Sequence, residues 1–186
     1  MTSQELIAKS KKIADSKTMY IKKGKGQYLS DRNKLWLSGI DPFNAKNSKK
    51  IFDASEDTHA YDEFGFFSEI SGFNCRNIGE IMALCDDISK DFTTIKPGEL
   101  VFMGDRFGIF IGKKKVISVN CVGVGYTILD NSWVSHGKLN DVEYLEEVQH
   151  ESSLELQDDG TGSGDRVQQV PSQDKGYDRG YGRRKS

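Results

Sequence analysis

The chain has 186 residues, of which 36% are hydrophobic and 29% are charged, and its formal net charge is −2. This length suits one domain with a hydrophobic core, and the high charged fraction predicts an additional polar segment that cannot bury enough apolar surface to order itself. The charge balance excludes a global attraction to nucleic acid or to an anionic membrane, and no stretch approaches the ~18 apolar residues of a membrane helix.

The first third of the chain carries helix and turn signals. Thr2 and Glu5 have the spacing of a capping box, and the apolar residues that follow fall on one stripe, which predicts a helix. Residues 22 to 26 are predicted to form a glycine-bearing turn, and residues 28 to 39 contain the apolar run Leu-Trp-Leu. Residues 41 to 55 are polar and are expected to be irregular.

Two further helices are predicted in the middle of the chain. Apolar residues recur every three positions from Phe64 to Ile70, which predicts a short buried helix that begins near Asp62 and ends at Gly72. Asn77 is a good capping residue ahead of another apolar face, so a second helix is expected to begin there.

Four short runs rich in Val, Ile and Phe follow, with brief glycine- or asparagine-bearing connections between them. Connections this short join neighbouring antiparallel strands, and Trp133 with residues 142 to 145 is expected to add a last strand. Helices followed by an antiparallel sheet predict an α+β fold for residues 1–148. The four runs are Glu99–Met103, Phe107–Ile111, Lys115–Val119 and Val122–Leu129.

The apolar pattern stops near Val148, and residues 149–186 have the composition of a flexible linker and tail. This segment is predicted to be disordered. Its end, residues 180 to 185, mixes aromatic and basic side chains, which would suit nucleic acid or a protein surface, although a solubilising role is favoured. The N-terminus lacks the apolar segment of a secretory signal, which predicts a cytoplasmic origin.

Three segments of the chain resemble known motifs in the same order and spacing. Residues 62 to 67 read Asp-Glu-Phe-Gly-Phe-Phe, residues 96 to 112 include Lys-Pro-Gly-Glu-Leu-Val-Phe and Phe-Gly-Ile-Phe-Ile-Gly, and residues 133 to 139 read Trp-Val-Ser-His-Gly-Lys-Leu. Together they resemble the NlpC/P60 family of cysteine peptidases, specifically the short forms encoded by phages of Gram-positive bacteria. The resemblance covers residues 4 to 145. It implies a papain-like fold with N-terminal helices packed on a small antiparallel sheet.

The resemblance also implies where a catalytic site would lie. The family uses a cysteine at a helix N-terminus as nucleophile, a histidine on the facing strand as base, and a third polar residue that orients the histidine. At the first two positions this chain has Glu63 and Arg106, and Ser118 or Asn120 falls at the third. A glutamate does not replace a thiolate here, and an arginine stays protonated at any working pH. The resemblance therefore implies a catalytically inactive pseudoenzyme.

Glu63 and Arg106 have opposite charge, and the cysteine and histidine that they replace are hydrogen-bond neighbours in the family. The resemblance therefore implies that Glu63 and Arg106 form an ion pair in the old cleft. Asp62, Phe64 and Asn120 are expected to line the same cleft. The implied function is a structural or binding module, whose partners would be a peptidoglycan stem peptide or phage structural proteins. The expected location is the bacterial host cytoplasm or the virion.

Two other functions stay open. One is an active peptidoglycan amide hydrolase that uses displaced residues, such as Cys75 with His59. The other is an adaptor that binds nucleic acid or a protein through the basic tail. No cofactor and no metal site are predicted, because the acidic residues between Asp53 and Glu63 match no known metal loop. The three cysteines lack CxxC spacing and are predicted to be buried free thiols.

Overall fold

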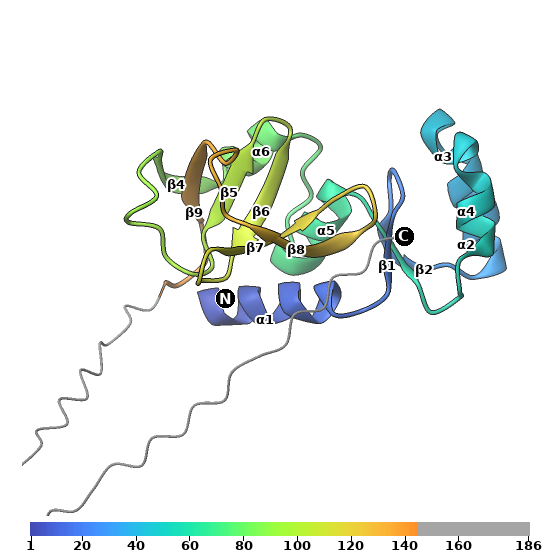
Figure 1. Cartoon of the computed structure of the whole chain (residues 1–186), viewed down its shortest axis with the longest axis horizontal. Helices are drawn as coiled ribbons and strands as arrows, with labels where there is room; N and C mark the ends of the chain where they lie inside the picture. The colour runs from blue at the N-terminus through green and yellow to red at the C-terminus, as the bar shows by residue number, and fades with distance from the viewer. Residues whose placement is uncertain (145–186) are drawn as a thin grey trace, which may run out of the picture. The chain divides into compact units, whose positions relative to one another are not determined.

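The computed structural model describes residues 1–144. The predicted tail, residues 149–186, and the end of the predicted last strand lie outside this range. The described chain is a mixed α+β structure in which helices accompany two β-sheets, as Figure 1 shows. Every helix in the described range is too short or too polar to cross a membrane.

Helix α1 (Ser3–Ala14) begins with the predicted capping box. The side chain of Thr2 accepts from the N–H of Glu5 at 3.2 Å, and the Glu5 carboxylate accepts from the N–H of Thr2 at 2.8 Å. These reciprocal bonds satisfy two N–H groups that have no partner inside the helix. The apolar stripe of α1 packs into the main hydrophobic core through the buried side chains of Leu6 and Ile7.

A small three-stranded sheet follows, which was not predicted. It has the order β1-β3-β2, where β1 (Thr18–Tyr20) pairs parallel with β3 (His59–Tyr61) and β2 (Lys25–Tyr28) pairs antiparallel with it. The predicted turn connects β1 to β2, and Lys23 and Gly26 adopt positive φ angles of 64° and 85° there. Strands of three or four residues carry too little alternation to be recognised from sequence.

Three helices lie between β2 and β3: α2 (Asp31–Gly39), α3 (Pro42–Lys46) and α4 (Ser48–Asp53). The expectation that residues 41 to 55 are irregular is therefore wrong. The reason is local capping, because the Asp41 carboxylate accepts from the N–H of Phe43 and Pro42 occupies the first turn. These helices share a second, smaller core with the small sheet. Its buried members are Ile21, Leu29, Leu37, Ile51 and Ala60.

The two predicted central helices are confirmed. Helix α5 (Glu63–Ser71) is capped by Asp62 and ends at Gly72, whose φ of 82° is the left-handed conformation that terminates many helices. Helix α6 (Ile78–Met82) begins after Asn77, whose side chain accepts from the N–H of Glu80 at 2.9 Å.

The larger sheet has six strands in the order β4-β9-β5-β6-β7-β8, and every neighbouring pair is antiparallel. The four predicted strands are confirmed as β5 to β8, with ends shifted by one or two residues. The last strand is β9, C-terminal to Trp133, whereas residue 143 forms only an isolated bridge with Thr2. The strands are β4 (Cys85–Ser89), β5 (Leu100–Met103), β6 (Arg106–Phe110), β7 (Lys115–Val119), β8 (Val124–Ile128) and β9 (Ser135–Leu139).

The two faces of the larger sheet bury different clusters. One face contributes Phe107 and Ile109 to the main core, together with aromatic side chains of α5 such as Phe66 and Phe67. The opposite face contributes Val116, which packs with Trp133 in a third cluster. This arrangement places the first turn of α5 near the end of the sheet where β6 begins.

Candidate functional site

The start of α5 is fixed by its capping residue. The carboxylate of Asp62 accepts from the N–H of Gly65 and from the N–H of Lys23, both at 2.7 Å, and the N–H of Asp62 donates to the carbonyl of Gly24 at 3.0 Å. One side chain therefore ties the helix to the turn between β1 and β2. A β-carbon on Gly65 would lie 1.9 Å from the Gly24 carbonyl oxygen, so this close approach requires glycine.

Glu63 occupies the first helical position, directly after the cap, and is partly buried. Burial raises the pKa of its carboxyl group, and the neighbouring charge of Asp62 acts in the same direction, while the charge of Arg106 opposes it. Desolvation is the largest of these effects. Glu63 is thus a carboxylate held in an environment that disfavours its charge.

Arg106 is the first residue of β6 and is exposed to solvent. The predicted ion pair with Glu63 is wrong, because no ion pair in the described part of the chain joins the two side chains within about 4 Å. Arg106 is exposed on the strand that follows the turn at Gly104, whereas Glu63 is partly buried. The two charges act on each other without contact.

Ser118 and Asn120 come from β7 and the turn after it. Ser118 is buried and pairs with Gly108 of β6. Asn120 follows two residues later, and its side-chain oxygen accepts from the N–H groups of Val122 and Gly123 at 2.8 and 3.1 Å. The β6–β7 register brings Asn120 to the end of the sheet where β6 begins, but its amide oxygen is occupied with the local turn.

Tyr20 is a member of this region that sequence reasoning missed. Its backbone N–H donates to the carbonyl of Val122 at 2.9 Å, which joins β1 to the turn after β7. Burial raises the pKa of the Tyr20 phenol, and the charges of Glu63 and Asp62 raise it further, whereas Arg106 lowers it. The phenol therefore lies within electrostatic range of all three. The sequence does not indicate this position of Tyr20, because it results from parallel pairing between two segments that are far apart in the chain.

The structure thus brings Asp62, Glu63, Arg106 and Tyr20 into one electrostatic neighbourhood at the α5 N-terminus. We call these four residues the helix-end site. Phe64 is partly buried and packs against the main core. That Phe64 lines a cleft with Asp62, Glu63, Arg106 and Asn120 stays a prediction.

His59 and Cys75, the residues considered for an active hydrolase, lie in different surroundings. The Nδ1 of His59 lies 2.9 Å from the carbonyl oxygen of Gly26, and its ring lies against Tyr28 at a centroid distance of 4.1 Å. Cys75 is partly buried, and burial raises the pKa of its thiol, with a further contribution from Glu80. Within the described residues, no hydrogen bond joins Cys75 to His59.

The other two thiols, Cys85 and Cys121, differ from each other in burial. Burial raises the pKa of Cys85 to about 12, and its thiol donates to the carbonyl of Ile81. Cys121 is exposed in the turn after β7, so the prediction that all three thiols are buried is wrong. A turn that protrudes from the sheet leaves its side chains in solvent whatever their polarity.

No group of three or more His, Cys, Asp or Glu side chains in residues 1–144 is arranged to hold a metal ion. Comparison of the chain with known protein families, with curated proteins and with solved structures finds no match.

Proposed function

We propose that this chain is a catalytically inactive domain of the NlpC/P60 type with a papain-like fold, which acts as a binding or structural module. One observation carries the proposal. At the helix terminus where amide hydrolysis would need a thiol, the chain has the partly buried carboxylate of Glu63, and at the first residue of β6, where it would need an imidazole, it has Arg106. Neither residue can take the role that this mechanism gives its position, because a carboxylate is not a thiolate nucleophile and a guanidinium stays protonated and cannot act as the base.

The geometry around α5 supports the papain-like part of the proposal. The helix begins beside the end of an antiparallel sheet, and the charges of Glu63 and Arg106 act on each other across that junction. Ser118 lies on the neighbouring strand, paired with the residue two positions after Arg106. A thiol, an imidazole and an orienting group at these places would have the relationship of a catalytic triad.

The separation of the two charges suggests the kind of ligand. Since the described residues contain no ion pair between them, a ligand with an amine and a carboxylate could engage Glu63 and Arg106 together. Peptidoglycan stem peptides carry both groups. A phage structural protein that presents a basic and an acidic side chain at similar spacing is the other partner consistent with the proposal.

The test combines a binding and an activity measurement. Titration calorimetry with soluble Gram-positive peptidoglycan fragments should show binding that Glu63→Gln and Arg106→Gln each weaken. Lys49→Gln, an exposed change on α4, is the matched control and should bind normally. Fragments that bind all four proteins equally would contradict the proposed site.

The activity measurement uses the same substrate and follows newly released amines. The natural chain should release none, and the double variant Glu63→Cys, Arg106→His should gain hydrolysis. If the natural chain releases amines and Cys75→Ser removes that activity, the chain is an active hydrolase and the proposal is wrong. The raised pKa of Cys75 disfavours that outcome, because the thiolate is the nucleophilic form.

A further inference from the structure

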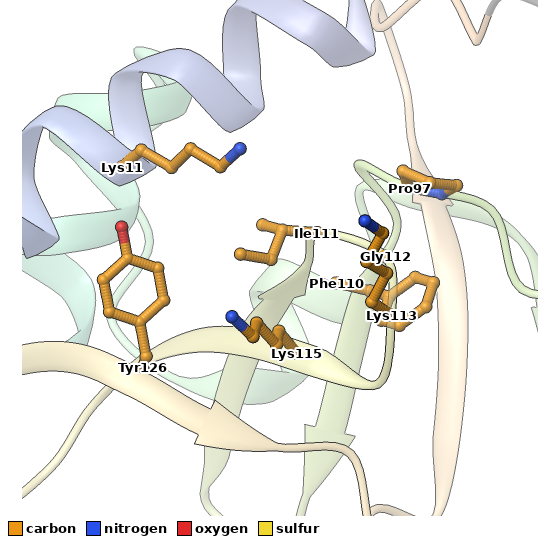
Figure 2. A pocket seen from close by; sticks show the side chains of 8 residues that line it. All are labelled: Lys11, Pro97, Phe110, Ile111, Gly112, Lys113, Lys115 and Tyr126. Carbon is orange, nitrogen blue, oxygen red and sulfur yellow. The ribbon is translucent and has the colours of Figure 1, made fainter.

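A second region, away from the helix-end site, combines a cavity with positive charge. The cavity has a volume of about 840 Å³ and lies where the last turn of α1 faces the β6–β7 turn and strand β8, as Figure 2 shows. Volumes of this size are typical of small-molecule sites. We call it the lysine pocket. Its lining residues are Lys11, Pro97, Phe110, Ile111, Gly112, Lys113, Lys115 and Tyr126.

Three of the lining residues are lysines from different elements. Lys11 comes from α1, Lys113 from the turn and Lys115 from the start of β7. None of them forms a salt bridge with another described residue. In Figure 2 the amines of Lys11 and Lys115 point into the space around Ile111. The three positive charges repel one another, so the arrangement favours an anion between them.

The turn that presents Lys113 is conformationally costly. Lys113 and Lys114 have positive φ angles of 51° and 56°, and the N–H of Lys115 donates to the carbonyl of Gly112 at 2.9 Å. Two central residues with positive φ define a type I′ turn, which strongly favours Asn-Gly or Gly-Gly. Consecutive lysines adopt it against their steric preference. One of these two strained residues, Lys113, lines the pocket.

The floor of the pocket is apolar, whereas its rim is charged. Pro97, Phe110 and Ile111 form part of the lining between the lysines. The phenol of Tyr126, which also lines the pocket, donates to the carboxylate of Asp15 at 2.7 Å. A ligand here would meet an apolar surface and several ammonium groups at once.

We propose that the lysine pocket binds a phosphate-bearing ligand. Several ammonium groups that approach from separate elements match the multiple negative charges of phosphate better than the single charge of one carboxylate. Lysine acts as a point charge that can contact a phosphate oxygen from any direction. Two sources supply this chemistry: a ligand with a ring that covers the apolar floor, as in a nucleotide, or a chain of phosphate groups alone.

Titration calorimetry of the full chain with adenosine triphosphate and with inorganic tripolyphosphate tests the proposal and separates the two sources. Binding should occur at physiological ionic strength and weaken as salt is added. Tighter binding of the nucleotide would assign a role to the apolar floor, and equal binding would assign the site to phosphate groups alone.

Variants locate the site. Lys11→Gln and Lys115→Gln should each weaken binding about tenfold, the loss expected for one charged hydrogen bond. The double variant Lys46→Gln, Lys49→Gln changes exposed lysines of α3 and α4 and should bind as the natural chain does. The proposal is overturned if neither probe binds at physiological ionic strength. It is also overturned if the control variant loses as much affinity as the pocket variants.

Discussion

The Nδ1 of His136 and the carboxylate Oε2 of Glu99 lie 2.5 Å apart, and both side chains are almost completely buried. The Nε2 of the same ring lies 2.9 Å from the carbonyl oxygen of Asp91. A carbonyl can only accept, so Nε2 carries a proton, and a second proton lies between Nδ1 and the carboxylate. The imidazole thus connects β9 to the start of β5 and to the loop that precedes it.

Breaking this pair should destabilise the fold strongly. His136→Leu leaves the Glu99 carboxylate buried without its partner, which costs about 3–5 kcal/mol. The double variant Glu99→Leu, His136→Leu should recover part of that loss. Lys138→Leu, on the same strand, breaks a solvent-exposed ion pair with Asp87 and should cost less than about 1 kcal/mol. Urea denaturation measures all three, and equal losses for His136→Leu and Lys138→Leu would disprove the role of the buried pair.

Gly65→Ala should be destabilising because the new methyl group overlaps the backbone of Gly24. Overpacking of this kind costs about 1–3 kcal/mol, and more where the obstacle is backbone. Gly39→Ala is the matched control, since a β-carbon there has no neighbour within 4 Å. Thermal unfolding should show a lower Tm for Gly65→Ala and an unchanged or raised Tm for Gly39→Ala. An unchanged Tm for both would mean that α5 and the turn can separate freely.

Glu63→Gln should stabilise the protein near neutral pH. Because burial raises the pKa of Glu63 above its ordinary value of 4.5, the folded state holds the proton more firmly than the unfolded state. The stability that the group contributes is present below pH 4.5 and is lost as pH rises through the folded-state pKa. At pH 7 the charged side chain therefore costs stability that glutamine restores. Denaturation at pH 3 and pH 7 should show the gain only at pH 7.

Glu69→Gln provides the control for this pH dependence, because Glu69 is exposed on the same helix. It should change stability little at either pH. A gain at pH 3 equal to that at pH 7 would show that glutamine acts through packing rather than through the charge of Glu63.

The thiols should differ in reactivity. Cys121 is exposed, whereas burial raises the pKa of Cys85 to about 12, so little thiolate is present there at pH 8. A chromogenic disulfide reagent at pH 8 should label Cys121 first and Cys85 only after unfolding. In a Cys75→Ser background, which removes the third, partly buried thiol, the variants Cys121→Ser and Cys85→Ser assign the two phases. Rapid labelling that survives Cys121→Ser would contradict the assignment.

Helices with strong terminal signals could be predicted from sequence. Thr2, Asp62 and Asn77 each cap a helix through a side chain that accepts from the backbone N–H three residues on, and this chemistry is local. Strands β5 to β8 could be recognised because short runs rich in Val, Ile and Phe are separated by turn residues. Both kinds of signal lie within a few neighbouring residues.

Elements stabilised by distant pairing could not be predicted. Strand β4 is mostly polar, and it forms because Cys85 pairs with Leu139 and Ser89 pairs with His136. The same limit applies to the helix-end site. The family resemblance pointed to Glu63 and Arg106, but the reach of their side chains depends on packing, and the predicted ion pair does not form.

The order of the larger sheet also bears on how the chain folds. Strand β9 lies between β4 and β5 although it is the last strand of the described chain. During synthesis, β5 to β8 can form their hairpins early, but β4 has no partner until residues 135 to 139 leave the ribosome. Such long-range closure is slow, because the loop entropy is lost before the contacts form. Until β9 inserts, the edges of β4 and β5 stay open to other chains, so aggregation would compete with folding at that stage.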